Sequence, residues 1–470
     1  MAGNMTGHHF RVMTFGESHG RAIGAVIDGV RPGLPIDLEF IQNELNRRRP
    51  GQSSFTTTRA EPDQIEILSG VFEGKTAGTP ICMIIWNKDQ KPQAYDKIKD
   101  MFRPGHAGYT YLAKFGVSDY RGGGRSSGRE TASRVAAGAV AKKLLAKKGM
   151  QIIGYTKEIG GISAQVVDPS FIERNPLRCP DPSVAKEMER VVTTAREEGD
   201  SVGGIVEVVV KNPPAGLGEP VFDKLEADLA KALMSIGAIR GFEVGNGFVA
   251  SRLRGSQNND PMYFDEGEQR VRTRTNNAGG ISGGISNGED IIVRIAVKPP
   301  SSIRKEQETV TVSGEPARIS VEGRHDPCIC PRVVPVAESM VALTLLDHLT
   351  RQRLLRRESR LSSLRGTIDL IDNNILLLIG ERQAIVGQIG EIKRKRGQKV
   401  IDPKRERQIL SKQLAVAKDL TLDLRFSEDL FKAIFQLART TQRGLRSDSG
   451  NGRRKRKDGR GTARRGKRAQ

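Results

Sequence analysis

The stretch Arg121–Thr131 combines three consecutive glycines with three arginines, a composition suited to binding an anion. Glycine lets the backbone approach a ligand closely. Ser127 and Glu130 have the spacing of a capping box, which predicts that a helix begins here. Because unpaired N–H groups at a helix N-terminus attract anions, we expect a phosphate site. A tight turn before an ordinary helix stays the alternative, and Arg129-Glu130 excludes the Walker A pattern, which needs Lys-Ser/Thr there.

Two histidines lie in other glycine-containing loops, His19 in Gly16–Gly20 and His106 in Arg103–Gly108. Neither lies in an apolar stripe, so neither is typical of a core residue. A histidine pKa lies near neutrality, which suits proton transfer, and both residues are therefore candidates for acid–base chemistry. A loop-bracing or surface histidine is the alternative for each one taken alone.

Four further segments carry cations or backbone-exposing glycines. Arg47–Arg49 ends a predicted helix, where positive charge suits the helix dipole. Asn276–Gly284 is a second glycine-rich loop, Lys298–Ser302 joins a cation to two hydroxyls, and Gly323–Cys328 contains an Arg-His-Asp triplet. Each could be a simple turn, but their recurrence in one chain favours a site for an anionic ligand.

The elements that must position these loops form a mixed α+β domain over residues 1 to about 357. The strand-like runs are Gln64–Leu68, Ile81–Trp86, Gly204–Val210 and Ile291–Val297. The helix-like runs are Glu39–Arg48, Ser127–Lys148, Pro182–Glu198, Val221–Ser235 and Val334–Arg353. The strands are short and the loops long, and the order of the strands stays open.

The pattern of apolar residues changes near Ser359. Apolar residues recur at spacings of three and four from Leu361 to Arg396 and predict one long amphipathic helix. Asp402-Pro403 predicts the cap and first turn of a second helix, which reaches about Leu420. A third helix is expected from Ser427. So long a first helix cannot bury its own apolar stripe, so we expect a dimer with intertwined helices.

About half of the net charge of +21 lies at the C-terminal end of the chain. From Arg443 to Gln470, twelve residues are Lys or Arg and two are Asp. We therefore expect a disordered basic tail over residues 447–470. It is either simply solvated or binds nucleic acid nonspecifically. Aromatic residues make up only 5% of the chain, which argues against a base-stacking nucleic-acid platform.

The four cysteines have neither zinc-site nor disulfide-framework spacing. We therefore expect a reduced, cytoplasmic protein without a bound metal. The sequence begins with no basic-then-apolar signal, and no run approaches the length that spans a membrane. No membrane contact is expected.

Three long segments, Phe15–Pro32, Arg121–Ala141 and Arg324–Ser339, make residues 1–357 resemble chorismate synthase. The resemblance implies conversion of 5-enolpyruvylshikimate 3-phosphate to chorismate by anti-1,4-elimination of phosphate. It implies reduced FMN as the cofactor, with NADPH as a candidate reductant. The implied fold is a β–α–β sandwich with two antiparallel four-stranded sheets between helices, assembled as a homotetramer.

The resemblance also implies roles for single residues. His19 would donate a proton near the flavin or the leaving phosphate, His106 would be a second acid near the flavin, and Asp326 would assist proton removal. The substrate would be held by Arg48, Arg129, Arg134 and Arg324. The flavin would be held by Arg125, Ser126, Ser127, Gly237, Ala238, Gly283, Lys298, Pro299, Pro300, Ser301, Ser302 and Arg324. Two positions depart from the family pattern: Ser54 is usually basic, with Arg59 as a potential substitute, and Gly237 is often Asn or Pro.

The segment after Ser359 carries Leu364-Arg365-x-x-Ile368-Asp369-x-x-Asp372, then Glu381-Arg382, Lys393, Asp402-Pro403-Lys404-Arg405-Glu406 and Gln442. With this run of residues, residues 359–446 resemble the all-helical type of chorismate mutase. Arg382 interrupts the apolar stripe of the first helix, and Lys393 lies eleven residues on, facing the same way. Cations on an apolar face need an anionic partner, such as a dicarboxylate ligand. A coiled coil with snorkelling charges is the alternative.

By this second resemblance, most of the mutase site comes from one protomer: Arg382, Lys393, Arg405, Glu406 and Gln442. Arg365 would come from the other protomer, and Asp402 would help to bind substrate. Lys393 and Gln442 would flank the ether oxygen of the pericyclic transition state. Ala438 replaces a serine that is common in the family.

Together the two resemblances predict a bifunctional enzyme that makes chorismate and rearranges it to prephenate, with fusion raising local chorismate at the mutase. Ala438 motivates a rival in which the helical block only binds chorismate as a regulator. The basic tail motivates another, a polyanion-binding module. Small-molecule substrates, a homotetramer through the first block and homodimer pairing of the second are the expected partners.

Overall fold

The computed structural model describes residues 3–53, 55–56, 61–89, 96, 98–322, 325–356 and 361–447. The chain divides into two compact units, Met1–Arg356 and Arg357–Gln470. The expectations for Ser54, Arg59, Arg324 and the basic tail fall on residues outside the described ones.

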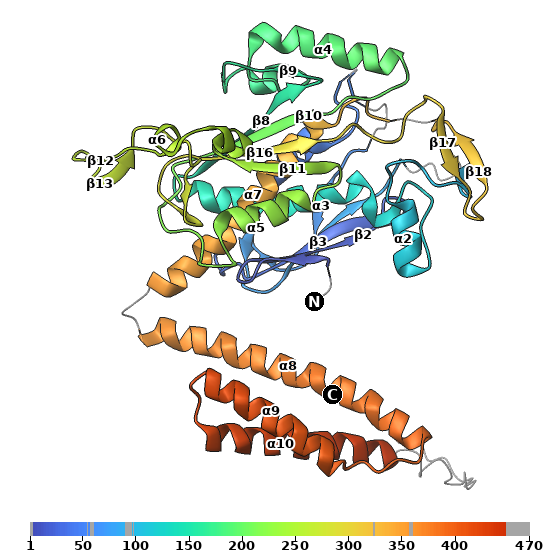
Figure 1. The fold of residues 1–470 in the computed structure, drawn as a ribbon, viewed down its shortest axis with the longest axis vertical. Helices are drawn as coiled ribbons and strands as arrows, with labels where there is room; N and C mark the ends of the chain where they lie inside the picture. Colours follow the sequence, from blue (N-terminus) through green and yellow to red (C-terminus); the bar gives the residue numbers. More distant parts are fainter. Residues whose placement is uncertain are drawn as a thin grey trace, which may run out of the picture. The chain divides into compact units, whose positions relative to one another are not determined.

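Two antiparallel sheets, each with five strands among the described residues, form the outer layers of the first unit (Figure 1). The first sheet has the order β1 (Met5–Thr6), β2 (Arg11–Gly16), β3 (Ala22–Asp28), β7 (Ile81–Trp86) and β4 (Ile65–Ile67). The second has the order β11 (Ile239–Val244), β16 (Ile291–Val297), β10 (Gly204–Lys211), β8 (Gln151–Ile159) and β9 (Ile162–Ser163). The expectation of four strands per sheet is wrong, because the two-residue strands β1 and β9 each extend one edge.

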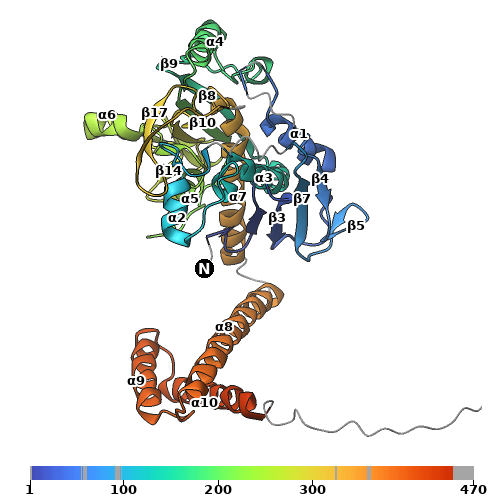
Figure 2. The same ribbon diagram turned by 90° about the vertical axis from the view of Figure 1, so that its right-hand side faces the viewer.

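Helices fill the space between the two sheets (Figures 1 and 2), which confirms the expected β–α–β sandwich with antiparallel sheets; the sheets enclose these helices rather than lying between helices. α3 (Thr131–Ala146) packs on β3, and α7 (Cys330–Arg356) packs on β8 and β10. α1 (Leu38–Arg48) and α5 (Leu225–Met234) pack beside them, while α4 (Pro182–Glu197) contacts β8 and β9. Small residues let α3 and α7 approach closely: a Cβ added at Gly138 would lie 2.7 Å from Ser339 Cα.

The core forms where the inward faces of the strands meet this helical layer. Val206, Val208 and Val210 of β10 are buried on one face, as the two-residue period of a strand requires. α3 is buried over most of its length, and its alanines fit between two sheets where longer side chains would not. The core thus encloses the helix that follows the glycine-rich stretch.

Short hairpins and turns complete the first unit. The paired strands are β5 (Val71–Phe72) with β6 (Lys75–Thr76), β12 (Met262–Asp265) with β13 (Arg270–Thr273), β14 (Ile281–Ser282) with β15 (Ile285–Ser286), and β17 (Gln307–Val310) with β18 (Pro316–Ile319). The remaining helices are α2 (Gly108–Phe115), α6 (Gly255–Asn258) and the 3₁₀ turns η2 (Gly124–Ser126), η3 (Gly128–Glu130), η4 (Ile172–Arg174) and η5 (Gly247–Arg252).

The predicted elements are largely confirmed. The four predicted strands are β4, β7, β10 and β16, and the predicted helices are α1, α3, α4, α5 and α7. Three starts are wrong: α5 begins at Leu225 rather than Val221, α3 begins at Thr131 rather than at Ser127, and α7 begins at Cys330 rather than Val334.

The second unit consists of α8 (Leu361–Lys395), α9 (Pro403–Asp419) and α10 (Leu424–Ser447), with α10 packed against both other helices. Asp402 caps α9 as predicted, its carboxylate accepting a hydrogen bond from the backbone N–H of Arg405 at 3.0 Å. The third helix begins at Leu424 rather than Ser427. Asp423 accepts a hydrogen bond from the N–H of Phe426 at 2.7 Å and takes the capping position.

One helix meets the length and composition of a membrane span. Cys330–Gln352, within α7, is long and apolar enough, so the expectation that no run approaches that length is wrong. Its most apolar window is 83% buried inside the protein. Packing against α3, β8 and β10 therefore accounts for its apolar character.

Candidate functional site

The glycine-rich stretch lies between the two loop histidines. Gly122 and Gly123 have φ of +70° and +89°, which glycine adopts without strain. A Cβ added at Gly122 would lie 2.7 Å from His19 Nδ1, and one added at Gly123 would lie 2.8 Å from His106 Cε1. Two histidines from distant parts of the chain are thus packed against successive glycines.

The predicted capping box does not form. Ser127 Oγ does accept a hydrogen bond from the N–H of Arg129 at 3.4 Å, but this caps η3. The Glu130 carboxylate instead pairs with Arg134 at 3.0 Å and accepts a hydrogen bond from Thr14 Oγ1. Two 3₁₀ turns therefore precede α3, and the stretch curls around the histidines.

The His19 ring is oriented by Ser18. Ser18 Oγ lies 3.0 Å from Nδ1 and donates to the Arg121 carbonyl at 3.4 Å. With its proton used there, the hydroxyl accepts from Nδ1–H, and the acceptor nitrogen of the neutral ring is Nε2. A histidine held in this way can exchange a proton at Nε2.

His106 is surrounded by donors. The N–H of Gly108 donates to Nδ1 at 3.2 Å, and Arg103 Nη2 lies 2.9 Å from Nε2. Burial, together with Arg103 and Lys298, lowers the pKa of His106 to about 3. The ring is therefore neutral near neutral pH.

The Lys298–Ser302 loop adjoins the His106 loop. A Cβ added at Gly105 would lie 3.2 Å from Ser301 Cβ and 3.8 Å from Lys298 Nζ. Arg103 Nη1 donates to Ser302 Oγ at 3.3 Å. Burial, and then the charge of Arg240, lowers the pKa of Lys298. Cations and hydroxyls thus converge beside His106.

The other positions expected to bind the flavin lie in two places, and only some of them adjoin the Lys298–Ser302 loop. The N–H of Lys298 donates to the Ala238 carbonyl at 2.9 Å, which places Gly237 and Ala238 beside the loop. Pro300 accepts a hydrogen bond from Ser201 Oγ at 2.7 Å, and with Pro299 it follows β16 directly. Gly283 is not brought here: the neighbouring Gly284 accepts from the N–H of Leu225, at the opposite end of α5, a helix about 15 Å long.

Arg125 points at the strand that leads to His19. Its Nη2 donates to Thr14 Oγ1 at 2.8 Å, and its Nη1 donates to the Gly16 carbonyl at 3.2 Å. These bonds fasten the glycine-rich stretch to β2. Ser126 Oγ donates to the Gly123 carbonyl at 2.7 Å and lies on the His106 side of the turn.

Two expected substrate-binding arginines share one buried carboxylate. Arg48 Nη1 donates to Asp63 at 3.2 Å, and Arg129 Nη1 donates to the other oxygen of the same carboxylate. Burial, with the charges of Arg332 and Arg129, lowers the pKa of Arg48 to about 9 despite Asp63. Arg129 Nη2 is buried 3.8 Å from Glu61 Oε2, an ion-pair distance, and has no hydrogen bond among the described residues. This buried N–H group can donate a hydrogen bond to a bound anion, although the charge of Arg129 already has two carboxylate partners.

Of the other substrate-site residues expected in the first unit, Asp326 lies beside this pair and Arg134 does not. Asp326 pairs with Arg332 at 2.5 Å, and Arg332 Nε donates to the Arg48 carbonyl at 3.3 Å. Arg134 is engaged elsewhere, with Glu130 and with Ser235 Oγ at 2.6 Å, next to Gly237. These contacts hold the side chains of Asp326 and Arg134 in place.

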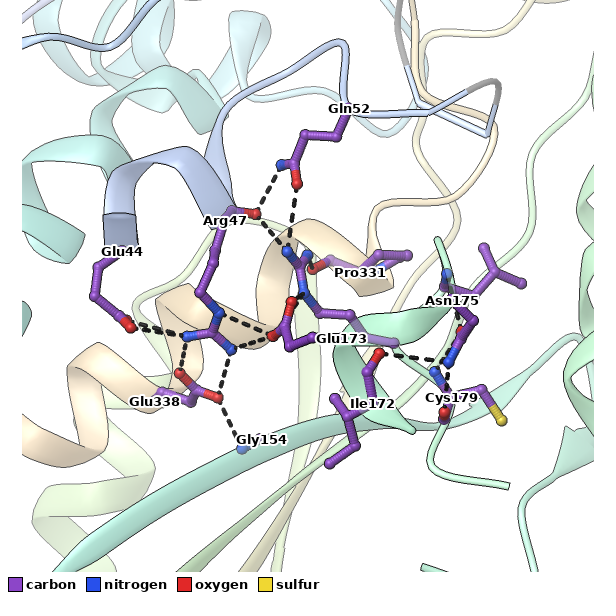
Figure 3. Close-up of polar contacts among 12 residues, drawn as sticks. Glu44, Arg47, Gln52, Gly154, Ile172, Glu173, Asn175, Cys179, Pro331 and Glu338 are labelled. Atoms are coloured by element: carbon purple, nitrogen blue, oxygen red, sulfur yellow. Dashed lines mark hydrogen bonds and ion pairs between the residues drawn. The ribbon is translucent and has the colours of Figure 1, made fainter. Parts of the chain in front are cut away.

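A buried ion network holds the end of α1 that carries Arg48 (Figure 3). Arg47 pairs with Glu338 at 2.6 Å, Glu173 at 2.7 Å and Glu44 at 3.1 Å. Lys142 pairs with both Glu338 and Glu44. Burial by itself would raise the pKa of Glu338, but Arg47 and Lys142 hold it well below its usual range.

The backbone carbonyls at this helix end are also bound. Gln52 Nε2 donates to the Arg47 carbonyl (Figure 3). Arg178 donates to the same carbonyl at 2.9 Å, and Gln52 Nε2 also donates to the Arg49 carbonyl. α1 therefore cannot rotate freely, and Arg48 is held toward Asp63.

Sequence reasoning missed the residues that act through others. Ser18, Asp63, Arg103 and Arg332 are the clearest cases. Ser18 and Arg103 had a signal in the sequence, since they lie in the loops of His19 and His106. Asp63 and Arg332 act across long sequence separations, Asp63 on Arg129 and Arg332 on the Arg48 carbonyl.

In the second unit, the expected mutase side chains lie along the packed helices. Arg382 Nη1 and Gln442 Oε1 are buried without hydrogen-bond partners among the described residues. Lys393 Nζ donates to the Val400 carbonyl at 2.8 Å. The side chain of Arg365 lies outside the described ones.

The residues around the start of α9 are occupied. Glu406 accepts a hydrogen bond from Arg439 Nε of α10 at 3.0 Å, a contact that the sequence did not indicate. Arg405 is exposed and donates to Gln408 at 2.7 Å, while the Asp402 carboxylate caps the helix. Buried cationic and amide groups along α8 and α10 suit an anionic ligand.

Comparisons with known proteins match both units. The family model described as chorismate synthase matches residues 10–350, and the model described as chorismate mutase type II matches residues 364–443. The chorismate synthase of Methanosarcina mazei is 57% identical over 358 residues, covering 75% of this chain and 97% of that protein. The chorismate synthase of Archaeoglobus fulgidus is 59% identical over 359 residues, covering 75% and 99%. A crystal structure of chorismate synthase superimposes with a TM-score of 0.60 at 30% identity, covering 79% of this chain and 99% of that one.

Proposed function

The chain belongs to the chorismate synthase family, and we propose that the pair of histidines packed on Gly122 and Gly123 is its synthase active site. With a chorismate mutase type II domain in the same chain, the protein is a bifunctional enzyme of the shikimate pathway. The observation that carries the proposal is the convergence of both histidines, Arg103 and Lys298 on one glycine-lined turn.

The residues of this turn fit an anionic flavin. Gly122 and Gly123 leave no space for a Cβ because the rings of His19 and His106 lie against them, so both imidazoles border the turn. Lys298 Nζ has one hydrogen bond among the described residues, to the Pro299 carbonyl at 3.3 Å, and its charge can serve an anion. Lys298 would hold reduced FMN together with the hydroxyls of Ser126, Ser301 and Ser302. Reduced FMN supplies electrons that are returned within each turnover, and NADPH is the reductant that we propose for it.

The protein's own residues bind the substrate and handle the protons. Arg48 and Arg129, aligned by Asp63, bind an anionic group of 5-enolpyruvylshikimate 3-phosphate. In its imidazolium form, with Nδ1–H bound to Ser18 Oγ and a second proton on Nε2, His19 donates the Nε2 proton as charge develops on the departing phosphate. Asp326, held by Arg332, receives the proton that the substrate loses.

The mutase site works by binding alone. Arg382, Lys393 and Gln442 present donors and an amide to a dicarboxylate, and the buried Arg382 Nη1 gains a partner when chorismate binds. Prearranged charges of this kind stabilise the polarised ether oxygen of the rearrangement. No covalent intermediate is needed.

Exposed apolar side chains of α8 support a proposed pairing of the second unit. Ile371 and Ile375 are 53% and 48% exposed, a cost that a second copy of the helix would remove. We therefore propose homodimer pairing through α8, with Arg365 reaching the partner's site, and a tetramer through the first unit. We assign the enzyme to the cytoplasm and only nonspecific nucleic-acid binding to the tail.

An anaerobic end-product assay tests the function. The protein, reduced FMN and 5-enolpyruvylshikimate 3-phosphate are mixed, and phosphate, chorismate and prephenate are quantified together. Phosphate matched by prephenate is expected. In R382A, phosphate should be matched by chorismate that persists. If the wild-type protein accumulates chorismate, the second unit is a binding regulator; if no phosphate appears, the synthase assignment fails.

A further inference from the structure

Arg103 lies at the centre of the cationic side of the synthase site, and neither the family pattern nor the mechanism above gives it a role. Its Nη2 lies 2.9 Å from His106 Nε2 and 3.3 Å from Nδ1, while its Nη1 donates to Ser302 Oγ. One guanidinium therefore joins the imidazole to the Lys298–Ser302 loop.

The donors around His106 are incompatible with a protonated ring. An imidazolium carries a proton on both nitrogens and accepts no hydrogen bond. Here the N–H of Gly108 donates to Nδ1, and the guanidinium of Arg103 lies against the ring, within 3.3 Å of both nitrogens. The ring can become an acid only if the positive charge of Arg103 moves away from it and the Gly108 N–H gives up its bond to Nδ1.

The charged groups that face His106 come from two loops. Arg103 comes from its own loop, and Lys298 comes from the loop after β16. The glycine-rich turn on the other side brings the Ser126 hydroxyl and, beyond Gly122, His19. α2 brings the N–H of Gly108. No carboxylate of the described residues is among the causes of the His106 pKa shift.

We infer that Arg103 is a positioning residue that couples anion binding to the protonation of His106. In this structure Arg103 lies on the ring and keeps it neutral. An anion beside Lys298 takes over the guanidinium donors and cancels the local positive charge. Nε2 of His106 then accepts a proton from water and the ring becomes the acid. The inference rests on the proposed synthase site and names what controls its second histidine.

The anion has two sources, the phosphate that leaves the substrate and the flavin. Both share the chemistry of an oxyanion that accepts from a guanidinium. Inorganic phosphate, FMN and riboflavin separate them. A response to phosphate alone identifies the leaving group, a response to FMN but not riboflavin identifies the flavin phosphate, and a response to both flavins identifies the ring system.

The test follows His106 directly by nuclear magnetic resonance. Flavin-free full-length protein is labelled with ¹³C at histidine Cε1, and the His106 signal is identified by its loss in H106N. Without an anion, the signal should stay in the neutral form down to about pH 4.5. A saturating anion should raise the titration midpoint by about two pH units or more, roughly a 100-fold gain in proton affinity.

Arg103→Gln should raise the midpoint without any anion and abolish the response to the anion. Arg318→Gln is the matched control, because Arg318 pairs with Glu306 on the exposed hairpin β17–β18 and should leave the titration unchanged. If Arg103→Gln fails to fold, Arg103→Lys serves instead. A single ammonium cannot bind the ring and Ser302 together, so the anion response should shrink.

An unchanged His106 titration in the folded Arg103 variant would overturn the inference, as would a wild-type midpoint that ignores phosphate, FMN and riboflavin alike. Either result leaves the proposed function standing if the wild-type enzyme still releases phosphate in the end-product assay. Failure of phosphate release in the wild-type protein would instead count against the proposed function. The kinetic signature agrees with the coupling only if Arg103→Lys changes the pH profile of kcat more than it changes KM.

Discussion

The two units of this chain treat their isoleucines in opposite ways. In the first unit, Ile23 and Ile27 of β3 and Ile81 and Ile85 of β7 are fully buried. In the second unit, the isoleucines of the α8 stripe, such as Ile385, remain about half exposed. The first unit closes its core with its own helical layer, whereas the second has one helix too long for its neighbours to cover.

This contrast indicates whether each active site can form within a single chain. The synthase residues are backed by partners within the unit, such as the carboxylate of Asp63 and the ion network around Arg47. The buried Arg382 and Gln442 of the second unit have unpaired atoms, and the face beside them lacks a cover. We therefore expect the second site to depend on association and the first to be prearranged.

The largest expected effect comes from breaking the closed core. Val208 is 1% exposed, and Val208→Asp buries a carboxylate without a partner, which should cost about 4 kcal/mol or more of the free energy of unfolding. Synthase activity should vanish, while prephenate formation from added chorismate persists. Loss of both activities would show that the second unit depends on the first.

The open face of the second unit offers the converse change. Ile375→Asp places a charge in the apolar stripe of α8 and should prevent pairing of the helices. We expect mutase activity to fall about 100-fold or more, as a loss of nearly 3 kcal/mol implies, with synthase activity unchanged. Sedimentation should show a smaller assembly. Asn373→Asp, opposite the stripe, is the control, and equal losses in both variants would exclude the stripe as the interface.

The buried ion pairs of the first unit should contribute more to stability than an exposed ion pair of the second unit. Glu338→Gln leaves the buried Arg47 and Lys142 short of an anion and should lower the free energy of unfolding by about 3–5 kcal/mol. Glu428→Gln breaks an exposed pair with Lys432 at 2.8 Å and should cost about 0.5 kcal/mol or less. Urea titrations of both variants measure the contrast. Similar costs would mean that the network does not stabilise α1.

The smallest effect is a difference in pH dependence. All six histidines belong to the first unit. The pKa of His106 is about 3 when folded and near 6.5 when unfolded, so its contribution to stability is present above pH 6.5 and is lost as the pH falls toward 3. His106→Asn should remove up to about 1.4 kcal/mol per pH unit from the acid-side slope of the first unit. The second unit should show no such change, and an unchanged slope in the first would contradict the lowered pKa.

Some of this molecule could be read from local patterns. Spacings of three and four placed α8 almost to the residue, and Asp402-Pro403 marked the start of α9. The capping box of Ser127 failed although its spacing was right, because Glu130 has a stronger partner in Arg134. Residue spacing indicates which local structure a segment favours. It does not show whether another residue competes for the same side chain, as Arg134 does for Glu130.

The sequence by itself determined the two-part organisation, the long amphipathic helix and the loops that carry His19, His106 and Lys298. Those features follow from composition and short-range spacing. Local backbone preferences and the burial of one face leave such regular patterns in the sequence. Only the tertiary structure decided that Gly122 faces His19 while Gly123 faces His106, and that one carboxylate, Asp63, holds two arginines. Such contacts join residues far apart in the chain, and packing between the two sheets, rather than any local preference, brings them together.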